Sequence, residues 1–170
     1  MKADTAKAEM TKQMEKIETF RELHVPGNPI ILYNIWDAGS AQAVAKSQRA
    51  IATSSWAVAK AHGSKDGEHF PYDLAIRNLR EIVDAVELPV TFDLESGYGE
   101  EPDKVGESIS LAIQAGAVGC NFEDSVPDNG TIRDIATRAA RIRGARRASE
   151  AAGVPFFINA RCDLFFRGLL

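Results

Sequence analysis

The stretch VTFDLESGYG, residues 90–99, joins an apolar strand to two acids and a glycine-containing turn. Four residues suited to a buried strand end at Asp93, and Glu95 follows two positions later. Side chains two apart on a strand point the same way. We therefore expect Asp93 and Glu95 to converge if the extended backbone persists through Leu94.

The rest of the chain repeats this unit of strand followed by helix. Apolar runs predict strands, and apolar residues at helical spacing predict helices that begin and end at proline, glycine or capping residues. The expected strands are 30–35, 50–55, 90–93, 117–122 and 154–160, and the expected helices are 4–23, 38–47, 73–86, 102–115 and 131–152. Residues 60–70 are expected to form a loop.

These strands lack the strict alternation of a half-exposed sheet, which indicates a parallel sheet covered by helices. Asp37 is placed to cap the second helix, Pro102 suits a first helical turn, and Gly116 ends that helix. TIRD at 131–134 matches a capping box, with Thr131 as the cap. The sequence thus predicts an α/β fold with an additional N-terminal helix.

Composition limits the classes of partner. The 170 residues are 45% hydrophobic and 26% charged, with a net charge of −4, so a nucleic-acid or membrane surface is not the expected main partner. No apolar run approaches the roughly 18 residues of a membrane-spanning helix. Residues 1–20 lack the apolar core of a signal peptide. Cys120 and Cys162 have no metal-ligand spacing, so we expect a cytoplasmic protein with reduced cysteines.

Charged residues recur at the ends of the expected strands. Parallel strands bring their carboxyl ends to one rim, where α/β folds build their sites. Mg²⁺ would relieve the repulsion among acids gathered there, because it takes oxygen ligands and needs only one or two direct carboxylates. Each acid alone could instead cap a helix or face solvent, but the pair Asp93 and Glu95 favours a metal site. Besides Asp93 and Glu95, the charged residues expected at this rim are Asp66, Glu123, Asp124, Arg161 and Asp163.

Five motifs in order, DLESGYG with ATSSW, KDGE, NFEDS and INARCD, resemble those of the isocitrate lyase/phosphoenolpyruvate mutase superfamily. The resemblance runs from about residue 20 to the last residue. It implies a (β/α)₈ TIM-barrel fold. It also implies a Mg²⁺-stabilised enolate, with a C–C or P–C bond made or broken next to a 2-oxo acid.

The same resemblance implies roles for individual residues. Asp93 is expected to bind the metal directly, and Asp66, Glu95 and Glu123 are expected to act on it through bound water. Ser54, Ser55 and Trp56 correspond to the stretch that holds the substrate carboxylate. Arg161 is expected to meet substrate oxygens, and Arg161 and Glu123 are the expected catalytic residues. The implied substrate is a small dicarboxylate or 2-oxo acid.

The loop after Glu123 departs from the superfamily pattern. The C–C lyases carry a cysteine that acts as general acid there, and the mutase and phosphonate enzymes carry a lysine and an asparagine. This chain has SVPDNGT at 125–131, with neither Cys nor Lys. The departure argues against methylisocitrate-type lyase or phosphomutase chemistry and leaves a simpler reaction, such as decarboxylation.

Length is the second departure, because a (β/α)₈ barrel needs roughly 250 residues. We expect a single partial domain over 1–170 with about five of eight β/α units, and a homo-oligomer in full-length form. A fragment or non-catalytic remnant of such an enzyme is the alternative. An unrelated phosphate-binding barrel is disfavoured, since no glycine-rich phosphate loop is visible. The six arginines of 131–152 are expected to form a solvated outer face.

Overall fold

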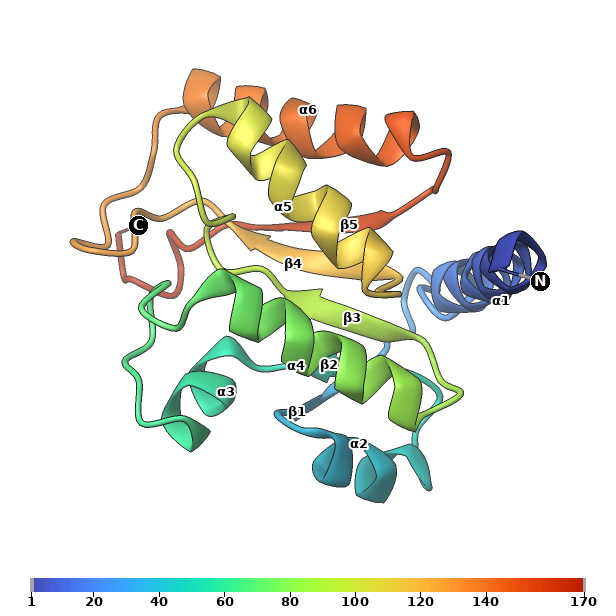
Figure 1. Cartoon of the computed structure of the whole chain (residues 1–170). Helices are drawn as coiled ribbons and strands as arrows, with labels where there is room; N and C mark the ends of the chain where they lie inside the picture. The colour runs from blue at the N-terminus through green and yellow to red at the C-terminus, as the bar shows by residue number, and fades with distance from the viewer. Residues whose placement is uncertain (1, 170) are drawn as a thin grey trace.

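The computed structural model describes residues 2–169, with side chains from residue 7 onward, and contains a five-stranded parallel sheet (Figure 1). The strands pair in chain order β1-β2-β3-β4-β5, and every neighbouring pair is parallel. Their bounds are Tyr33–Ile35 (β1), Ile51–Thr53 (β2), Val90–Asp93 (β3), Gly119–Glu123 (β4) and Phe157–Arg161 (β5). All strands therefore end at one rim.

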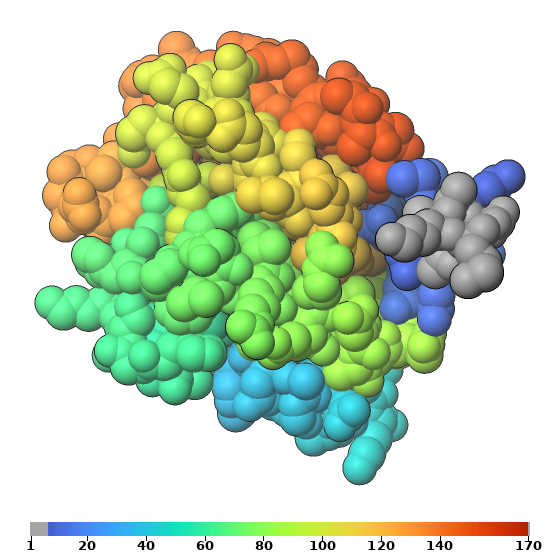
Figure 2. Space-filling model, viewed as in Figure 1, coloured from blue at the N-terminus to red at the C-terminus, as the bar shows by residue number. Residues whose placement is uncertain are grey.

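Helices connect the strands and cover the outer face of the sheet (Figure 1). Their bounds are Lys2–Glu22 (α1), Ala38–Ala45 (α2), Ser55–Ala61 (α3), Tyr72–Ala85 (α4), Pro102–Gln114 (α5) and Ile135–Ala151 (α6). On this side the side chains of α4 and α5 form a continuous surface (Figure 2). Gly144 lets α6 approach α5 closely, because a Cβ at this position would collide with the Pro102 carbonyl. No helix within residues 2–169 is both long and apolar enough to cross a bilayer.

Helix α1 lies at the end of the sheet opposite the rim (Figure 1). Its Gln13 side chain donates to the carbonyls of Ile113 and Ala117, each at 2.9 Å. The ring of Phe20 packs edge-on against Phe157 of β5, with centroids 5.2 Å apart. The helix thereby covers the amino ends of the strands and leaves the rim open.

The sheet order and most element boundaries confirm the predicted α/β fold with five β/α units. Asp37 caps α2 by accepting from the Ser40 amide, Pro102 begins α5, and Gly116 follows α5 with a φ of 92°. The predicted capping box at 131–134 is wrong. Asp134, not Thr131, caps α6, because its carboxylate accepts from the Thr137 amide at 3.0 Å.

The inner face of the sheet borders an open hollow of about 660 Å³. Polar side chains from β1, β3, β4 and β5 line it, together with residues of the segment 24–32. Asp93 and Arg161 lie at its rim end. Within residues 2–169, β1 and β5 each pair on one side only, so they are the edges of the sheet. The polar inner-face residues are Asn34, Thr91, Asn121 and Asn159.

Candidate active site

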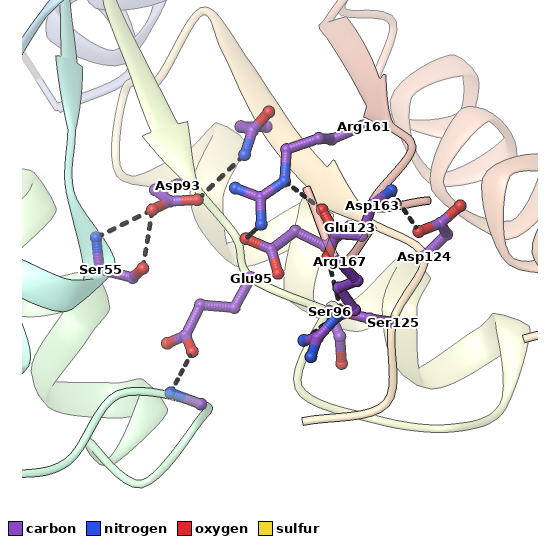
Figure 3. Close-up of polar contacts among 12 residues, drawn as sticks. Ser55, Asp93, Glu95, Ser96, Glu123, Asp124, Ser125, Arg161, Asp163 and Arg167 are labelled. Atoms are coloured by element: carbon purple, nitrogen blue, oxygen red, sulfur yellow. Dashed lines mark hydrogen bonds and ion pairs between the residues drawn. The ribbon is translucent and has the colours of Figure 1, made fainter. Parts of the chain in front are cut away.

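Asp93, the last residue of β3, is held by donors on two neighbouring elements (Figure 3). Its Oδ2 accepts from the backbone amide of Ser55 at 3.0 Å and from the Ser55 hydroxyl at 2.7 Å. Its Oδ1 accepts from Asn121 Nδ2 at 3.2 Å. Asn121 in turn accepts from Asn159 Nδ2 at 2.8 Å. The carboxylate therefore has a fixed orientation at the edge of the hollow.

Glu123 and Arg161 meet at the rim because they are register partners at the ends of β4 and β5. Arg161 Nη2 lies 2.7 Å from Glu123 Oε1. Arg161 Nε donates to Asp163 Oδ1, also at 2.7 Å. With two of its three nitrogens engaged in this way, the guanidinium is oriented while it still lines the hollow. The sequence places these residues at one rim, and the structure brings them into direct contact.

A buried network of Asp163, Asp124, Ser125 and Arg138 supports Arg161, and the sequence predicted the position of its two acids but not the network. Asp163 is fully buried, accepts from the Ser125 hydroxyl at 2.6 Å, and its amide donates to Asp124 Oδ1 at 2.9 Å. Arg138 pairs with the other oxygen of Asp124 at 2.7 Å. Burial opposes ionisation of Asp163, but the bonds from Arg161 and Ser125 outweigh it and lower its pKa. The only sequence signal was the recurrence of acids after β4 and β5.

Glu95 does not converge with Asp93. The extended backbone ends at Asp93, and Glu95 adopts a φ of 52°, in the left-handed region. The condition for convergence, an extended backbone through Leu94, is thus not met. Figure 3 shows the Glu95 side chain directed away from Asp93 and toward the loop after α3. The two carboxylates of the DLESGYG motif consequently have different surroundings.

The remaining predicted residues lie on the β2 side of the rim. Ser54 accepts from the Ala57 amide and so caps α3, a helix that the sequence did not predict. The Ser55 hydroxyl is used on Asp93, and the Trp56 side chain is exposed. Asp66 is exposed in the loop after α3, near enough to Glu95 to raise the pKa of that residue.

Like charges accumulate at this rim. Burial is the main cause that raises the pKa of Glu123, to about 7, with Arg161 opposing it and Asp93, Asp163 and Glu95 adding to it. Burial also raises the pKa of Glu95. Among the described side chains, no three His, Cys, Asp or Glu residues are grouped closely enough to hold a metal ion together. Mg²⁺ needs only one or two direct carboxylates, so one ligand surrounded by nearby acids fits this ion.

Arg141 of α6 and Arg133, just before the helix, fix the loops that carry the site, contrary to the predicted solvated face. Arg141 is 2% exposed and donates to the carbonyls of Ser96, Gly99 and Glu100. Arg133 donates to the Ser125 carbonyl and pairs with Glu100 at 2.6 Å. These two arginines therefore tie the turn after β3 to the loop after β4. Of the remaining arginines of α6, Arg138 is half-buried and those at 143, 146 and 147 are exposed.

The loop that lacks the superfamily's cysteine or lysine is folded back on itself. Ser125 and Ile132 form an antiparallel bridge, and the Val126 amide donates to the Thr131 carbonyl at 2.8 Å. Gly67, in the loop after α3, lies beside Pro127 of this segment. The two loops thus meet at the same edge of the molecule (Figure 2).

Comparison with known proteins assigns this architecture to a family. The family model for phosphoenolpyruvate phosphomutase matches residues 20–169. An uncharacterised protein of Mycobacterium tuberculosis (strain ATCC 25618 / H37Rv) is 32% identical over 149 residues, which are 87% of this chain and 54% of that protein. The chain therefore spans about half the length of this curated relative.

Solved structures show the same fold. The crystal structure of a protein from Burkholderia cenocepacia J2315, inferred to be a phosphonomutase, is 52% identical, with a TM-score of 0.89 over 91% of this chain and 62% of that one. A phosphonopyruvate hydrolase, solved with oxalate and Mg²⁺, is 20% identical, with a TM-score of 0.82 over 91% of this chain and 55% of that one. These neighbours confirm the partial TIM-barrel fold. The chain therefore belongs to the phosphoenolpyruvate phosphomutase family, within the phosphoenolpyruvate mutase/isocitrate lyase superfamily.

Proposed function

We propose that this chain carries the Mg²⁺ and substrate site of an enzyme that acts on a small 2-oxo acid, or its adduct, through an enolate. The observation that carries the proposal is that Asp93 and Arg161 lie at the rim end of one open hollow, with Glu123 paired to Arg161. The phosphonopyruvate hydrolase that binds oxalate and Mg²⁺ supports it by analogy. C–C or P–C cleavage and decarboxylation all proceed through such an enolate.

The proposed roles follow from the chemistry of the side chains. Asp93 would hold Mg²⁺ directly, and Asp66 and Glu123 would bind its water. The bound ion would supply a fixed positive charge where negative charge develops in the enolate. Arg161, oriented by Asp163 and Glu123, would donate to substrate oxygens and stabilise the same charge. Trp56 and the first turn of α3 would border the substrate carboxylate.

The first prediction concerns the metal ligand. Asp93→Asn removes one charge without changing shape, so the dissociation constant for Mn²⁺, used as a spectroscopic substitute for Mg²⁺, should rise at least about tenfold, or 1.4 kcal/mol. Electron paramagnetic resonance measures free Mn²⁺ whatever the oligomeric state of the protein. Asp103→Asn is the matched control, because that side chain is 92% exposed and lies on α5. Equal Mn²⁺ binding by wild type and Asp93→Asn would remove Asp93 from the site.

The second prediction concerns the substrate class. Oxalate is a small dianion that resembles the enolate of pyruvate, and it should bind in equilibrium dialysis only when Mg²⁺ is present. Arg161→Met should weaken this binding by about tenfold or more, since a charge-assisted hydrogen bond contributes roughly 1.5–3 kcal/mol. Oxalate binding of equal strength in excess EDTA would contradict a metal-dependent site.

The alternative is that the chain is a non-catalytic remnant or fragment, which keeps these motifs without a working site. The loop 125–131, which has neither the cysteine nor the lysine of the superfamily's enzymes, favours it. Mn²⁺ and oxalate binding without turnover of 2-oxo acids would support it. A cytoplasmic location and a homo-oligomeric full-length protein remain part of the main proposal, and the free thiols of Cys120 and Cys162 are compatible with the former.

A further inference from the structure

Glu95 is only 6% exposed, and both oxygens of its carboxylate accept hydrogen bonds from the protein. Oε2 accepts from the amides of Gly67 at 2.9 Å and Glu68 at 2.6 Å. Oε1 accepts from the Tyr98 hydroxyl at 2.6 Å. Three donors therefore face this carboxylate, and two of them are backbone amides of the loop after α3.

Glu68 returns the same interaction from the opposite side. Its Oε1 accepts from the Ser96 hydroxyl at 2.7 Å and from the Tyr98 amide at 2.8 Å. Each segment thus contributes one glutamate whose carboxylate accepts hydrogen bonds from backbone amide groups of the other segment. The two pairs of bonds form a reciprocal clamp between the loop 63–70 and the turn 95–99.

Backbone conformation points to the same clamp. Among the described residues, the non-glycine residues with positive φ are Glu68 at 62°, Glu95 at 52° and Tyr98 at 53°, and all three belong to it. A non-glycine residue in this region carries strain and persists only where its surroundings hold it. The clamp supplies that constraint.

Side-chain length explains why a glutamate serves here. The positive φ turns the Glu95 side chain out of the line of β3 and away from Asp93 (Figure 3). An aspartate in its place would be one methylene shorter and would fall short of the Gly67 and Glu68 amides. The extra methylene of Glu95 is therefore what lets it reach the loop.

We propose that Glu95 is a positioning residue whose carboxylate holds the loop 63–70, and with it Asp66, against the rim, instead of binding the water of a cation at Asp93. The second half of this statement rests on the proposed function, whereas the first rests on the clamp alone.

Two substitutions of Glu95 separate the effect of its side-chain length from the effect of its charge. Glu95→Asp keeps the charge but loses the reach, so the Gly67 and Glu68 amides should exchange hydrogen at least about tenfold faster. Glu95→Gln keeps the reach, because its amide oxygen can accept from the loop while its nitrogen donates to the Tyr98 oxygen. Exchange of the same two amides should then rise less than about threefold, since neutral hydrogen bonds are roughly half as strong as charged ones.

Hydrogen-exchange mass spectrometry of peptides over 60–70 measures both effects, and a peptide within α4 serves as the internal control. Glu68→Ala is a second variant, which removes the clamp from the half-buried Glu68 side and should also speed exchange of these amides. The ion-binding part is tested by Mn²⁺ titration of Glu95→Gln, whose dissociation constant should stay within about threefold of wild type.

Unchanged amide protection in Glu95→Asp would overturn the clamp. A rise of about tenfold or more in the Mn²⁺ dissociation constant of Glu95→Gln, with loop protection intact, would place Glu95 in the water shell of the ion and overturn the second half. If wild type binds no Mn²⁺, the proposed function fails, and the exchange data still decide the clamp.

Discussion

Residues 1–170, produced alone, are expected to self-associate, because within residues 2–169 the sheet has two unpaired edges and an open hollow at its inner face. On the segment leading into β1, Ile31 is 76% exposed, and within β1 Tyr33 is 55% exposed. Unpaired strand edges with apolar side chains promote intermolecular pairing. If several hundred Å² of apolar surface stay exposed, the cost is on the order of 10 kcal/mol at 25 cal/mol per Å².

Sedimentation velocity and binding of an apolar dye would measure this association. The double variant Ile31→Lys with Tyr33→Lys places charge on the β1 edge and should shift the sedimentation distribution toward monomer. Leu111→Lys on α5, where Leu111 is 42% exposed, adds charge away from the edges and should not. Supplying three further β/α units from a full-length relative should abolish dye binding and replace open-ended association with one defined oligomeric state. A compact, dye-free wild-type monomer would contradict the expectation.

Arg141→Met is expected to destabilise the fold by at least about 3 kcal/mol, because it leaves three carbonyls of the turn after β3 without their donor, at roughly 1–3 kcal/mol each. The side chain is 2% exposed, and methionine keeps much of its volume. Burial lowers the pKa of Arg141. The three carbonyls and the nearby Glu100 therefore stabilise the buried positive charge.

Urea unfolding at one protein concentration would compare this variant with Arg143→Met, which changes an exposed arginine of the same helix and should shift the midpoint little. Arg141→Lys should fall between wild type and Arg141→Met, since one ammonium cannot serve carbonyls on both sides. A midpoint for Arg141→Met equal to that of Arg143→Met would show that the turn does not depend on this side chain.

Local patterns were enough to predict the order of the strands and of every helix except α3. Apolar runs marked five strands, and the signals at Asp37, Pro102 and Gly116 act within one helical turn, so they can be read without knowing the fold. The rim placement of Asp93, Glu123 and Arg161 also followed, because parallel strands end on one side whatever their exact register. The five motifs added the family.

Other local signals failed where two of them competed. Thr131 and Asp134 both suit a helix cap, and the bridge between Ser125 and Ile132 keeps Thr131 in the loop, so Asp134 caps α6. Helix α3 has only seven residues, too few for a periodic pattern to stand out. Its cap, Ser54, could be taken equally well for a substrate-binding residue.

The sequence by itself therefore determined the fold class, the residues that lie at the rim and the family, since each depends on patterns that repeat along the chain. Only the tertiary structure decided which side chains touch. Whether Glu95 joins Asp93 depends on one φ angle, which the contacts with Gly67 and Glu68 hold at a positive value. Whether Arg141 faces water depends on how closely α6 packs on the turn after β3. Both are set by residues 27 to 45 positions away, and such distant contacts leave no periodic trace in the sequence.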